Sequence, residues 1–410
     1  TFGWTRADYW FPEVRSLGGA VAMFVLVLYP YVYMLARTAF LERAGGLLEV
    51  ARSMGLSPWQ GFVRVSLPLA RPAIAAGVAL ALMEALADYG TVSYFAVQTF
   101  TTGIYRAWFS LGDRAAAAQL ALVLLAFVGL VLAAERSLRG RARFDDASLR
   151  RSGSSRVDVH GLRAGLATAG CALPLVLGFV LPAGLLLRMA WVEGDAQFGE
   201  RFLILARHSV TLAGATALLA VALALLIGYA ARVHRGRGMR WVHRASGLGY
   251  ALPGSVIAVG VLIPVTRIDH ILAAVAREVG GVEVGRLLTG TIAALVYACL
   301  VRYLSAAVQT VDAGLARITP QMDQAARSLG HSPAQTLVRV HLPLLRGSLL
   351  TAALLVFIDV MKELPATLVM RPFNFDTLAT QTFVLASDER LAEASTAALA
   401  IVAVGLVPMV

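Results

Sequence analysis

The sequence predicts an all-α fold, a polytopic bundle of transmembrane helices made of two parallel repeats. Three observations predict it. The 410 residues are 58% hydrophobic and only 15% charged, whereas charged residues make up about a quarter of an average soluble domain. Apolar segments long enough to cross a bilayer recur along the chain, and one stretch of sequence returns almost unchanged 275 positions later, at Ala326 after Ala51.

Nine segments have the roughly 20 mostly apolar residues that one membrane crossing requires, the last of them only in part. The loops 37–71, 136–163 and 232–244 carry five, eight and five arginines, so the net charge of +11 follows topology and does not indicate a nucleic-acid partner. The positive-inside rule places these loops and 312–343 in the cytoplasm, and the remaining loops outside. The expected spans are 18–39, 72–93, 115–134, 164–190, 209–231, 246–266, 289–311, 344–361 and 393–410.

The internal repeat predicts the domain organisation. Ala51–Leu69 aligns without gaps to Ala326–Leu344, with 13 of 19 positions identical. Self-similarity at a fixed offset indicates duplicated structural units, and two copies on one side of the membrane indicate parallel repeats. We expect the C-terminal part of a first half in 1–135, a cytoplasmic linker in 136–163 and a second half in 164–410. Because the second half holds six expected spans and the first only three, about three more are expected before Thr1.

Each copy of the repeat has the residue order of a helix end followed by a helix start. Gly55 suits the left-handed turn that ends a helix, and the first helix is expected to be short. Ser57 and Pro58 suit an N-cap with proline at the first helical position. Pro68 is expected to stop the second short helix. The second copy has Gly330, Ser332, Pro333 and Pro343 at the matching positions.

These loops resemble a motif of ABC importer permeases, in which Glu-Ala-Ala is followed after three residues by Gly and after nine more by Ile-x-Leu-Pro. The second copy has Gln324 where the family has Glu. In that family the loop is the coupling helix that docks on a cytoplasmic ABC ATPase. The resemblance therefore implies an ATPase-coupling role for Glu49, Ala51, Gly55, Ser57, Pro58, Leu67, Pro68, Gln324, Ala326, Gly330, Ser332, Pro333, Leu342 and Pro343.

The resemblance also implies partners and a location. We expect two copies of a separate ATPase, a periplasmic substrate-binding protein and membrane lipid as partners, in a bacterial inner membrane. A phosphate-binding loop of the form GxxxxGK[ST] requires a lysine, and the only lysine is Lys362, so the chain is not its own ATPase and no enzyme activity is expected. Cys171 and Cys299 lie in apolar segments without metal-ligand spacing, and we expect no metal site or cofactor.

The substrate is indicated by two further stretches. Residues 86–109 and 359–394 resemble the fused permeases of ferric iron importers. Thiamine and phosphonate importers have similar fused permeases, and they remain alternatives. An ion-coupled secondary transporter can also be built from parallel repeats, but matched docking loops on the cytoplasmic side are not required for it.

Four carboxylates lie at membrane depth and match between the repeats: Glu84 with Asp359 and Asp88 with Glu363. The spacing i, i+4 predicts that each pair shares one helix face. Ionisable groups at this depth usually face a cavity or a partner, and hard oxygen ligands suit a trivalent metal ion. These acids could line a translocation pathway or gate, or they could be structural groups neutralised by neighbours such as Lys362.

Overall fold

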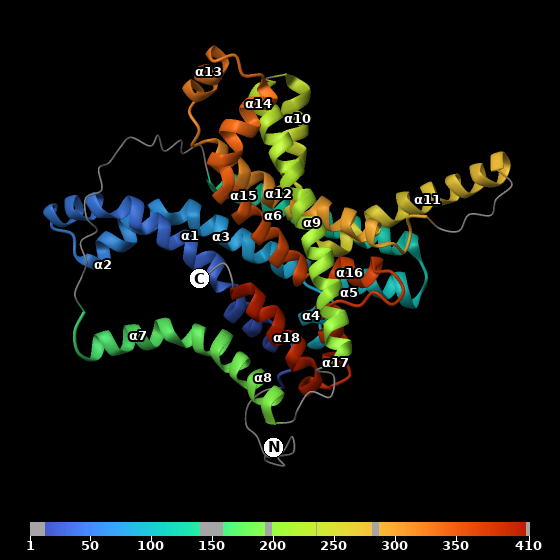
Figure 1. Ribbon diagram of the computed structural model, residues 1–410. Coiled ribbons are helices and arrows are strands. Elements are labelled where there is room, and N and C mark those ends of the chain that lie inside the picture. Colours follow the sequence, from blue (N-terminus) through green and yellow to red (C-terminus); the bar gives the residue numbers. More distant parts are fainter. Residues whose placement is uncertain (1–12, 140–158, 193–198, 235, 281–286, 407–410) are drawn as a thin grey trace. The chain divides into compact units, whose positions relative to one another are not determined.

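The computed structural model describes residues 13–139, 159–192, 199–234, 236–280 and 287–406, apart from the side chains of 42–49, 138–139 and 279–280. All regular structure in these residues is helical (Figure 1). This confirms the all-α prediction. Because a bilayer interior offers no water to backbone N–H and C=O groups, a chain of this composition satisfies them within its own helices.

The helices follow the chain in one order. Residues up to 139 form α1 (Leu17–Ser53), α2 (Pro58–Gly61), α3 (Leu67–Ala87), α4 (Gly90–Tyr94), α5 (Phe100–Tyr105) and α6 (Arg114–Arg139). Residues 162–315 form α7 (Leu162–Leu175), α8 (Leu181–Val192), α9 (Glu200–Val233), α10 (Arg237–Ser246), α11 (Gly254–Gly280) and α12 (Ile292–Leu315). The remainder forms α13 (Pro320–Ser328), α14 (Pro333–Thr336), α15 (Leu342–Met361), α16 (Pro365–Met370), α17 (Leu378–Ser387) and α18 (Leu391–Leu406).

Shorter π-helical and 3₁₀ segments join some of these helices. The π segments are η1 (Phe62–Ser66), η2 (Arg106–Ser110), η3 (Val176–Val180) and η5 (Leu337–His341), and η4 (Gly249–Ala251) is a 3₁₀ turn. Two of them, η1 and η5, occupy matching positions 275 residues apart and lead directly into α3 and α15.

Eight helical segments of the described residues are long and apolar enough to cross a membrane. They confirm eight of the nine expected spans, although α9 and α11 extend well past the expected 209–231 and 246–266. The ninth, 393–410, corresponds to α18, which has 16 described residues and is shorter than a full crossing. The eight segments are Leu17–Leu41, Pro58–Ala87, Arg114–Ser137, Leu162–Val192, Glu200–Val233, Gly254–Glu278, Ile292–Leu315 and Pro333–Met361.

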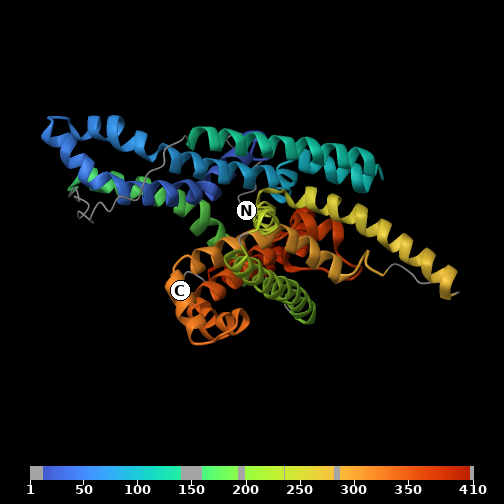
Figure 2. The same cartoon turned by 90° about the horizontal axis from the view of Figure 1, so that it is seen from above.

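The described residues fall into two compact units. Unit 1 comprises residues within 1–102 and 123–184, and unit 2 those within 103–122 and 185–410. In unit 1, α1 and α3 lie side by side (Figure 1 and Figure 2). The two backbones approach so closely that a Cβ added at Gly77 of α3 would lie 2.7 Å from the Cα of Val32 in α1. Small residues at such crossings let membrane helices gain dispersion contacts.

Unit 2 has a core of three packed helices, α9, α12 and α15. Alanines fill much of it, so the helices approach closely: Ala213, Ala220 and Ala224 of α9 are almost completely buried. Larger side chains such as Leu295 and Val308 of α12 fill the remaining space. This core supports the loop between α12 and α15, which contains the second copy of the repeat.

The repeat extends to the helix that precedes each loop. Ser16 caps α1 by accepting a hydrogen bond from the N–H of Gly19, and Thr291 caps α12 by accepting one from that of Ala294. Ser16 and Thr291 are 275 positions apart. Each capped helix then packs on the helix that follows its loop, α1 on α3 and α12 on α15. The duplicated unit is therefore a span, a loop and a second span.

The prediction that Pro68 and Pro343 stop the second short helix is wrong. The helix runs without a break from Pro58 into α3 and from Pro333 into α15. A proline has no N–H and its ring collides with the carbonyl four residues earlier. The preceding π segment widens the turn, since the N–H of Leu67 bonds to the carbonyl of Phe62 five residues back, and the helix continues past the proline.

The prediction of a short first helix holds only for the second copy, where α13 has nine residues. In the first copy, α1 continues from its membrane span to Ser53 as one helix of 37 residues. The reason is Pro320, because the residue before a proline avoids the helical region and α13 has to start anew there. Position 45 of the first copy is glycine, which leaves the helix intact. The expected linker 136–163 lies mostly outside the described residues.

Replacing Gly77 with alanine is expected to lower the free energy of unfolding by about 1–3 kcal/mol, because the added methyl group overpacks the contact between α1 and α3. Thermal unfolding of the purified protein in detergent measures the change. Gly129→Ala in α6 is the control, since nothing lies within 4 Å of its added Cβ. Equal melting temperatures for the two variants would show that α1 and α3 do not pack as described.

Candidate functional site

The turn at each loop is built in the same way in both copies. Gly55 has a φ of 82° and Gly330 a φ of 80°, the left-handed region that favours glycine. The N–H of Gly55 bonds to the carbonyl of Arg52, and that of the next residue bonds back to Ala51. The second copy repeats both bonds, from Gly330 to Arg327 and from His331 to Ala326. The expected glycine turn is present in both copies.

The helix start after each turn is a capping box. The Ser57 hydroxyl accepts a hydrogen bond from the N–H of Gln60, and the Gln60 side chain accepts one from the N–H of Ser57. Ser332 and Gln335 form the same reciprocal pair. Pro58 and Pro333 occupy the first helical position, where a missing N–H costs nothing. These bonds satisfy four otherwise unpaired backbone donors and hold both loops rigidly.

Burial repeats between the copies at the start of the motif and differs at its end. Ala51 and Ala326 are each only 4% exposed, because their side chains face the body of the protein. Gln324 is exposed, whereas the side chain of its counterpart Glu49 lies outside the described residues. At the end of the motif, Leu67 and Pro68 are half-buried, and Leu342 and Pro343 are exposed.

Large apolar side chains stand exposed at the tips of both loops. Met54 is 76% exposed and its counterpart Leu329 is 78% exposed. Trp59 and Val338 on the following helices are also exposed. Trp59 stacks on Phe62, and Phe62 contacts Phe40 of α1, which fixes the first loop to its helix. Each of the two turns thus presents exposed apolar groups, as a docking surface does.

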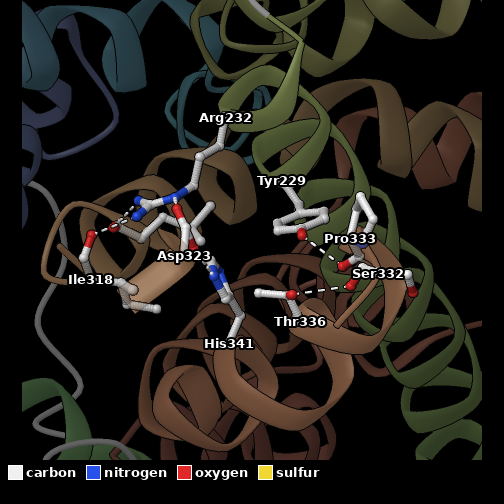
Figure 3. A network of polar contacts seen from close by, with 9 residues as sticks. Tyr229, Arg232, Ile318, Asp323, Ser332, Pro333, Thr336 and His341 are labelled. Carbon is white, nitrogen blue, oxygen red and sulfur yellow. Dashed lines mark hydrogen bonds and ion pairs between the residues drawn. The ribbon is translucent and has the colours of Figure 1, made fainter. Parts of the chain in front are cut away.

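A polar network behind the second loop was not predicted from the sequence (Figure 3). Its centre is Arg232, in the last turn of α9. The Nε of Arg232 donates to Oδ2 of Asp323 at 2.8 Å, and its two terminal nitrogens donate to the carbonyls of Leu315 and Ile318 at 2.9 and 2.7 Å. His341 lies 2.6 Å from the other carboxylate oxygen of Asp323. One guanidinium therefore joins α9, the end of α12 and α13.

Two further contacts extend the network to α14. The Tyr229 hydroxyl donates to the carbonyl of Pro333 at 2.7 Å, and the Thr336 hydroxyl donates to that of Ser332 at 3.0 Å. The rings of Tyr229 and His341 meet edge to face. The partners lie up to 104 residues apart in the chain, so no local sequence pattern indicates them. The only available signal was that Asp323 and His341 differ from Leu48 and Ser66 at the matching positions.

Asp323 is ionised at neutral pH. Burial raises the pKa of its carboxyl, but the hydrogen bonds from Arg232 and His341 outweigh that effect, and the pKa lies below its usual value of 3.8. The stabilisation from a carboxylate with a depressed pKa is present above the usual pKa and is lost as the pH falls through the depressed one. Asp323 thus keeps its negative charge throughout the physiological range.

The prediction that each pair of intramembrane acids shares a helix face is wrong. The helix α3 ends at Ala87 and α15 ends at Met361, so Asp88 and Glu363 lie beyond the helices that carry Glu84 and Asp359. Asp88 accepts hydrogen bonds from the side chain of Thr91 and the N–H of Val92 in α4. Glu363 accepts one from the N–H of Ala366 in α16. Both carboxylates thus lie at the N-terminus of the short helix that follows and accept one of its N–H groups, where a negative charge is favourable.

Glu363 is also part of a buried ion pair. Only 3% of it is exposed, and one of its oxygens lies 2.6 Å from Nη1 of Arg302 in α12 and accepts a hydrogen bond from the Tyr303 hydroxyl. Asp359 is paired with Lys362 at 3.0 Å, near the protein surface. The contacts of Glu363, Asp359 and Asp88 therefore agree with the second alternative, that these acids are structural groups paired with neighbouring residues. Among the described residues, no group of three or more His, Cys, Asp or Glu could hold a metal ion.

Comparison with known proteins assigns the chain to a family. Residues 14–142 and 220–410 match the family model of the binding-protein-dependent transport system inner membrane component. The chain belongs to this family. Each matched segment contains one of the two capped loops, which confirms that two permease halves are fused in one polypeptide. The chain is thus a multi-pass subunit of an ABC importer, and a transport component rather than an enzyme.

Individual relatives share less of the chain. It is 28% identical over its full length to the Fe(3+)-transport system permease protein FbpB 2 of Haemophilus influenzae, of which it covers 78%. It is 26% identical over 201 residues to the putative 2-aminoethylphosphonate transport system permease protein PhnV of Salmonella typhimurium, covering 49% of this chain and 70% of the relative. A bacterial alginate ABC transporter structure matches with a TM-score of 0.45 and 16% identity, covering 60% of this chain and 90% of that one.

The buried pair of Arg302 and Glu363 allows a direct test of its structural role. Arg302→Gln is expected to lower the free energy of unfolding by about 3–5 kcal/mol, because it leaves a buried carboxylate without its counter-charge. The double variant Arg302→Gln with Glu363→Gln is expected to recover most of that loss. Thermal unfolding in detergent measures both.

The matched control is Lys362→Gln, which breaks the pair with Asp359 at the surface and is expected to cost at most about 1 kcal/mol. If Arg302→Gln is as stable as Lys362→Gln, the buried pair does not hold α15 and α16 to α12.

Proposed function

We propose that the permease forms the translocation pathway of an ATP-driven importer of ferric iron. In this proposal two cytoplasmic ATPase subunits dock on the two capped loops and a periplasmic binding protein delivers the substrate. The observation that carries the proposal is the duplicated loop, with the same glycine turn, the same capping box and matching exposed apolar side chains in both copies. Two matched surfaces, both on loops that the positive-inside rule places in the cytoplasm, suit two copies of one partner.

The geometry of the loops suits force transmission. A capped helix in a groove of a partner binds through the apolar side chains on its exposed face. The capping boxes of Ser57 and Ser332 keep each loop in its binding conformation, so little ordering entropy is lost on docking. The continuous helices from Pro58 and Pro333 into α3 and α15 give each loop a direct mechanical connection to a span. Alternating access by such rigid-body motion is a common mechanism of transport.

Replacing both Gly55 and Gly330 with isoleucine is expected to release the ATPase. A β-branched residue is strongly disfavoured at a φ near 80°, so both turns would have to unwind. Each site is expected to lose about 1–3 kcal/mol of the free energy that holds the turn. Co-purification of the tagged permease with its ATPase, and uptake in cells with equal permease levels, measure the effect.

Gly129→Ala is the control for this experiment, because its Cβ meets nothing within 4 Å in α6. If the variant with both glycines replaced co-purifies with the ATPase and transports normally, the two loops are not the docking surface.

The ferric iron assignment is supported by the relative that aligns over the whole chain, FbpB 2, whose name specifies Fe(3+) transport. The phosphonate permease PhnV aligns over about half of the chain, and it keeps a phosphonate as the second candidate substrate. We further propose that Glu84 and Asp359 add negative potential to the outer half of the pathway, with the charge of Asp359 partly offset by Lys362 at 3.0 Å. Asp88 and Glu363 contribute less to it, because their carboxylates accept N–H groups of α4 and α16 and Glu363 is neutralised by Arg302.

Replacing Glu84 with Gln and Asp359 with Asn together is expected to lower uptake of radiolabelled ferric iron by about tenfold, the effect of about 1.4 kcal/mol on a rate-limiting barrier. Uptake is measured in the presence of the binding protein, in cells with equal membrane levels of permease. Wild-type uptake by this variant would assign the two acids a structural role. No iron uptake by the unmodified permease, with uptake of a phosphonate, would move the substrate assignment to the second candidate.

A further inference from the structure

We propose that the network of Arg232, Asp323 and His341 fixes the second coupling loop (312–343) to α9, so that nucleotide-driven motion of this loop moves α9 directly. The first coupling loop (42–71) has uncharged residues, Leu48 and Ser66, at the positions that match Asp323 and His341. These residues act as positioning residues and do not touch the substrate. The inference rests on the proposed function, because it assigns a route to motion that an ATPase imposes on the loops.

The geometry of Arg232 supports a rigid connection. Its guanidinium makes hydrogen bonds in three directions, to Asp323 of α13, to the carbonyl of Leu315 at the last turn of α12 and to the carbonyl of Ile318. Because the planar guanidinium of Arg232 is held by three fixed partners, α13 cannot move without moving α9 as well. Cationic groups are also favoured at a helix C-terminus such as that of α12.

His341 adds the fourth element. It is completely buried at the end of η5, and its Nε2 lies 2.6 Å from Oδ1 of Asp323. An ionised carboxylate only accepts hydrogen bonds, so Nε2 must carry the proton. Asp323 is thus held from two sides, by Arg232 of α9 and by His341 of the helix that continues into α15. Figure 3 shows both contacts converging on this carboxylate.

The first loop cannot form the same link. The positions that match Asp323 and His341 are Leu48 and Ser66, neither of which carries a charge. Ser66 is buried like His341, but its hydroxyl has no hydrogen-bond partner within the described part of the chain. Phe62 instead packs on Phe40 of α1. Packing between aromatic rings permits sliding that a hydrogen-bonded charge pair resists, because the pair depends on direction.

The test compares Asp323→Asn with Ser66→Ala, which alters the matched buried position of the other loop. Both are made in a permease with Cys171→Ser and Leu203→Cys, because Cys171 is exposed, Cys299 is buried and Leu203 lies exposed near the start of α9. The full complex with its ATPase is reconstituted, and the rate of maleimide labelling at position 203 is measured with and without ATP and vanadate. Co-purification and ATP hydrolysis are measured in the same samples.

We expect Asp323→Asn to keep its ATPase and to hydrolyse ATP while most of the nucleotide dependence of labelling is lost. The change in labelling rate between the states with and without ATP and vanadate is expected to fall about tenfold, since a hydrogen bond between charged groups is lost. Ser66→Ala is expected to behave like the unmodified complex. His341→Ala removes one of the two supports of Asp323 and is expected to show a smaller loss in the same direction, which tests the link if Asp323→Asn does not assemble.

If labelling at position 203 still depends fully on nucleotide in Asp323→Asn, the inference is overturned and the docking proposal stays intact. If Asp323→Asn does not assemble, the same result in His341→Ala overturns it. An equal loss in Ser66→Ala would overturn the asymmetry between the loops. A permease that binds no ATPase even without these changes would instead overturn the docking proposal, on which the inference rests.

Discussion

The constraint on which the rest of this structure depends is that backbone polar groups in a bilayer must find partners within the protein. It forces the chain into helices. Wherever a helix is interrupted, other groups have to form hydrogen bonds with the backbone N–H and C=O groups left free. Pro68 and Pro343 are accommodated by a π segment, whereas the ends of α3 and α15 are followed by Asp88 and Glu363, whose carboxylates accept the free N–H groups of the next helix. In the two loops, α1 and α13 end at glycine turns and α2 and α14 begin with capping boxes, which pair backbone groups that helix ends leave free.

Much of the fold could be read from the sequence because spans, turns and caps depend on residues close together in the chain. Hydropathy located eight of the spans, and the offset of 275 matched both loops with the correct caps. The end of α3 was missed, since the apolar pattern continues past Asp88 and the expected span 72–93 runs beyond Ala87. The expected span 344–361 does end with α15, at Met361. The separate start of α13 coincides with Pro320, which has Gly45 as its counterpart in the first copy.

The polar groups of the site were harder to predict. Arg232 bonds to a carboxylate 91 residues away and Arg302 to one 61 residues away, and no periodicity links such positions. Arg232 was counted only as a topology signal, and Arg302 lies within an apolar span. The duplication gives one indication of such contacts. Where the two copies have unlike residues at equally buried positions, as with Ser66 and His341, one half has contacts that the other lacks.

Because the helix continues through Pro68, motion at one end of it is transmitted to the other end. Pro58–Ala87 has 30 residues, which corresponds to a rod of about 45 Å at 1.5 Å per residue. A tilt of about 10° about one end of such a rod displaces the other end by about 8 Å. A break at the proline would have created a joint that absorbs the tilt within the loop. The π turn keeps the helix continuous, so a small rotation at the cytoplasmic end becomes a displacement as large as a side chain at the opposite end.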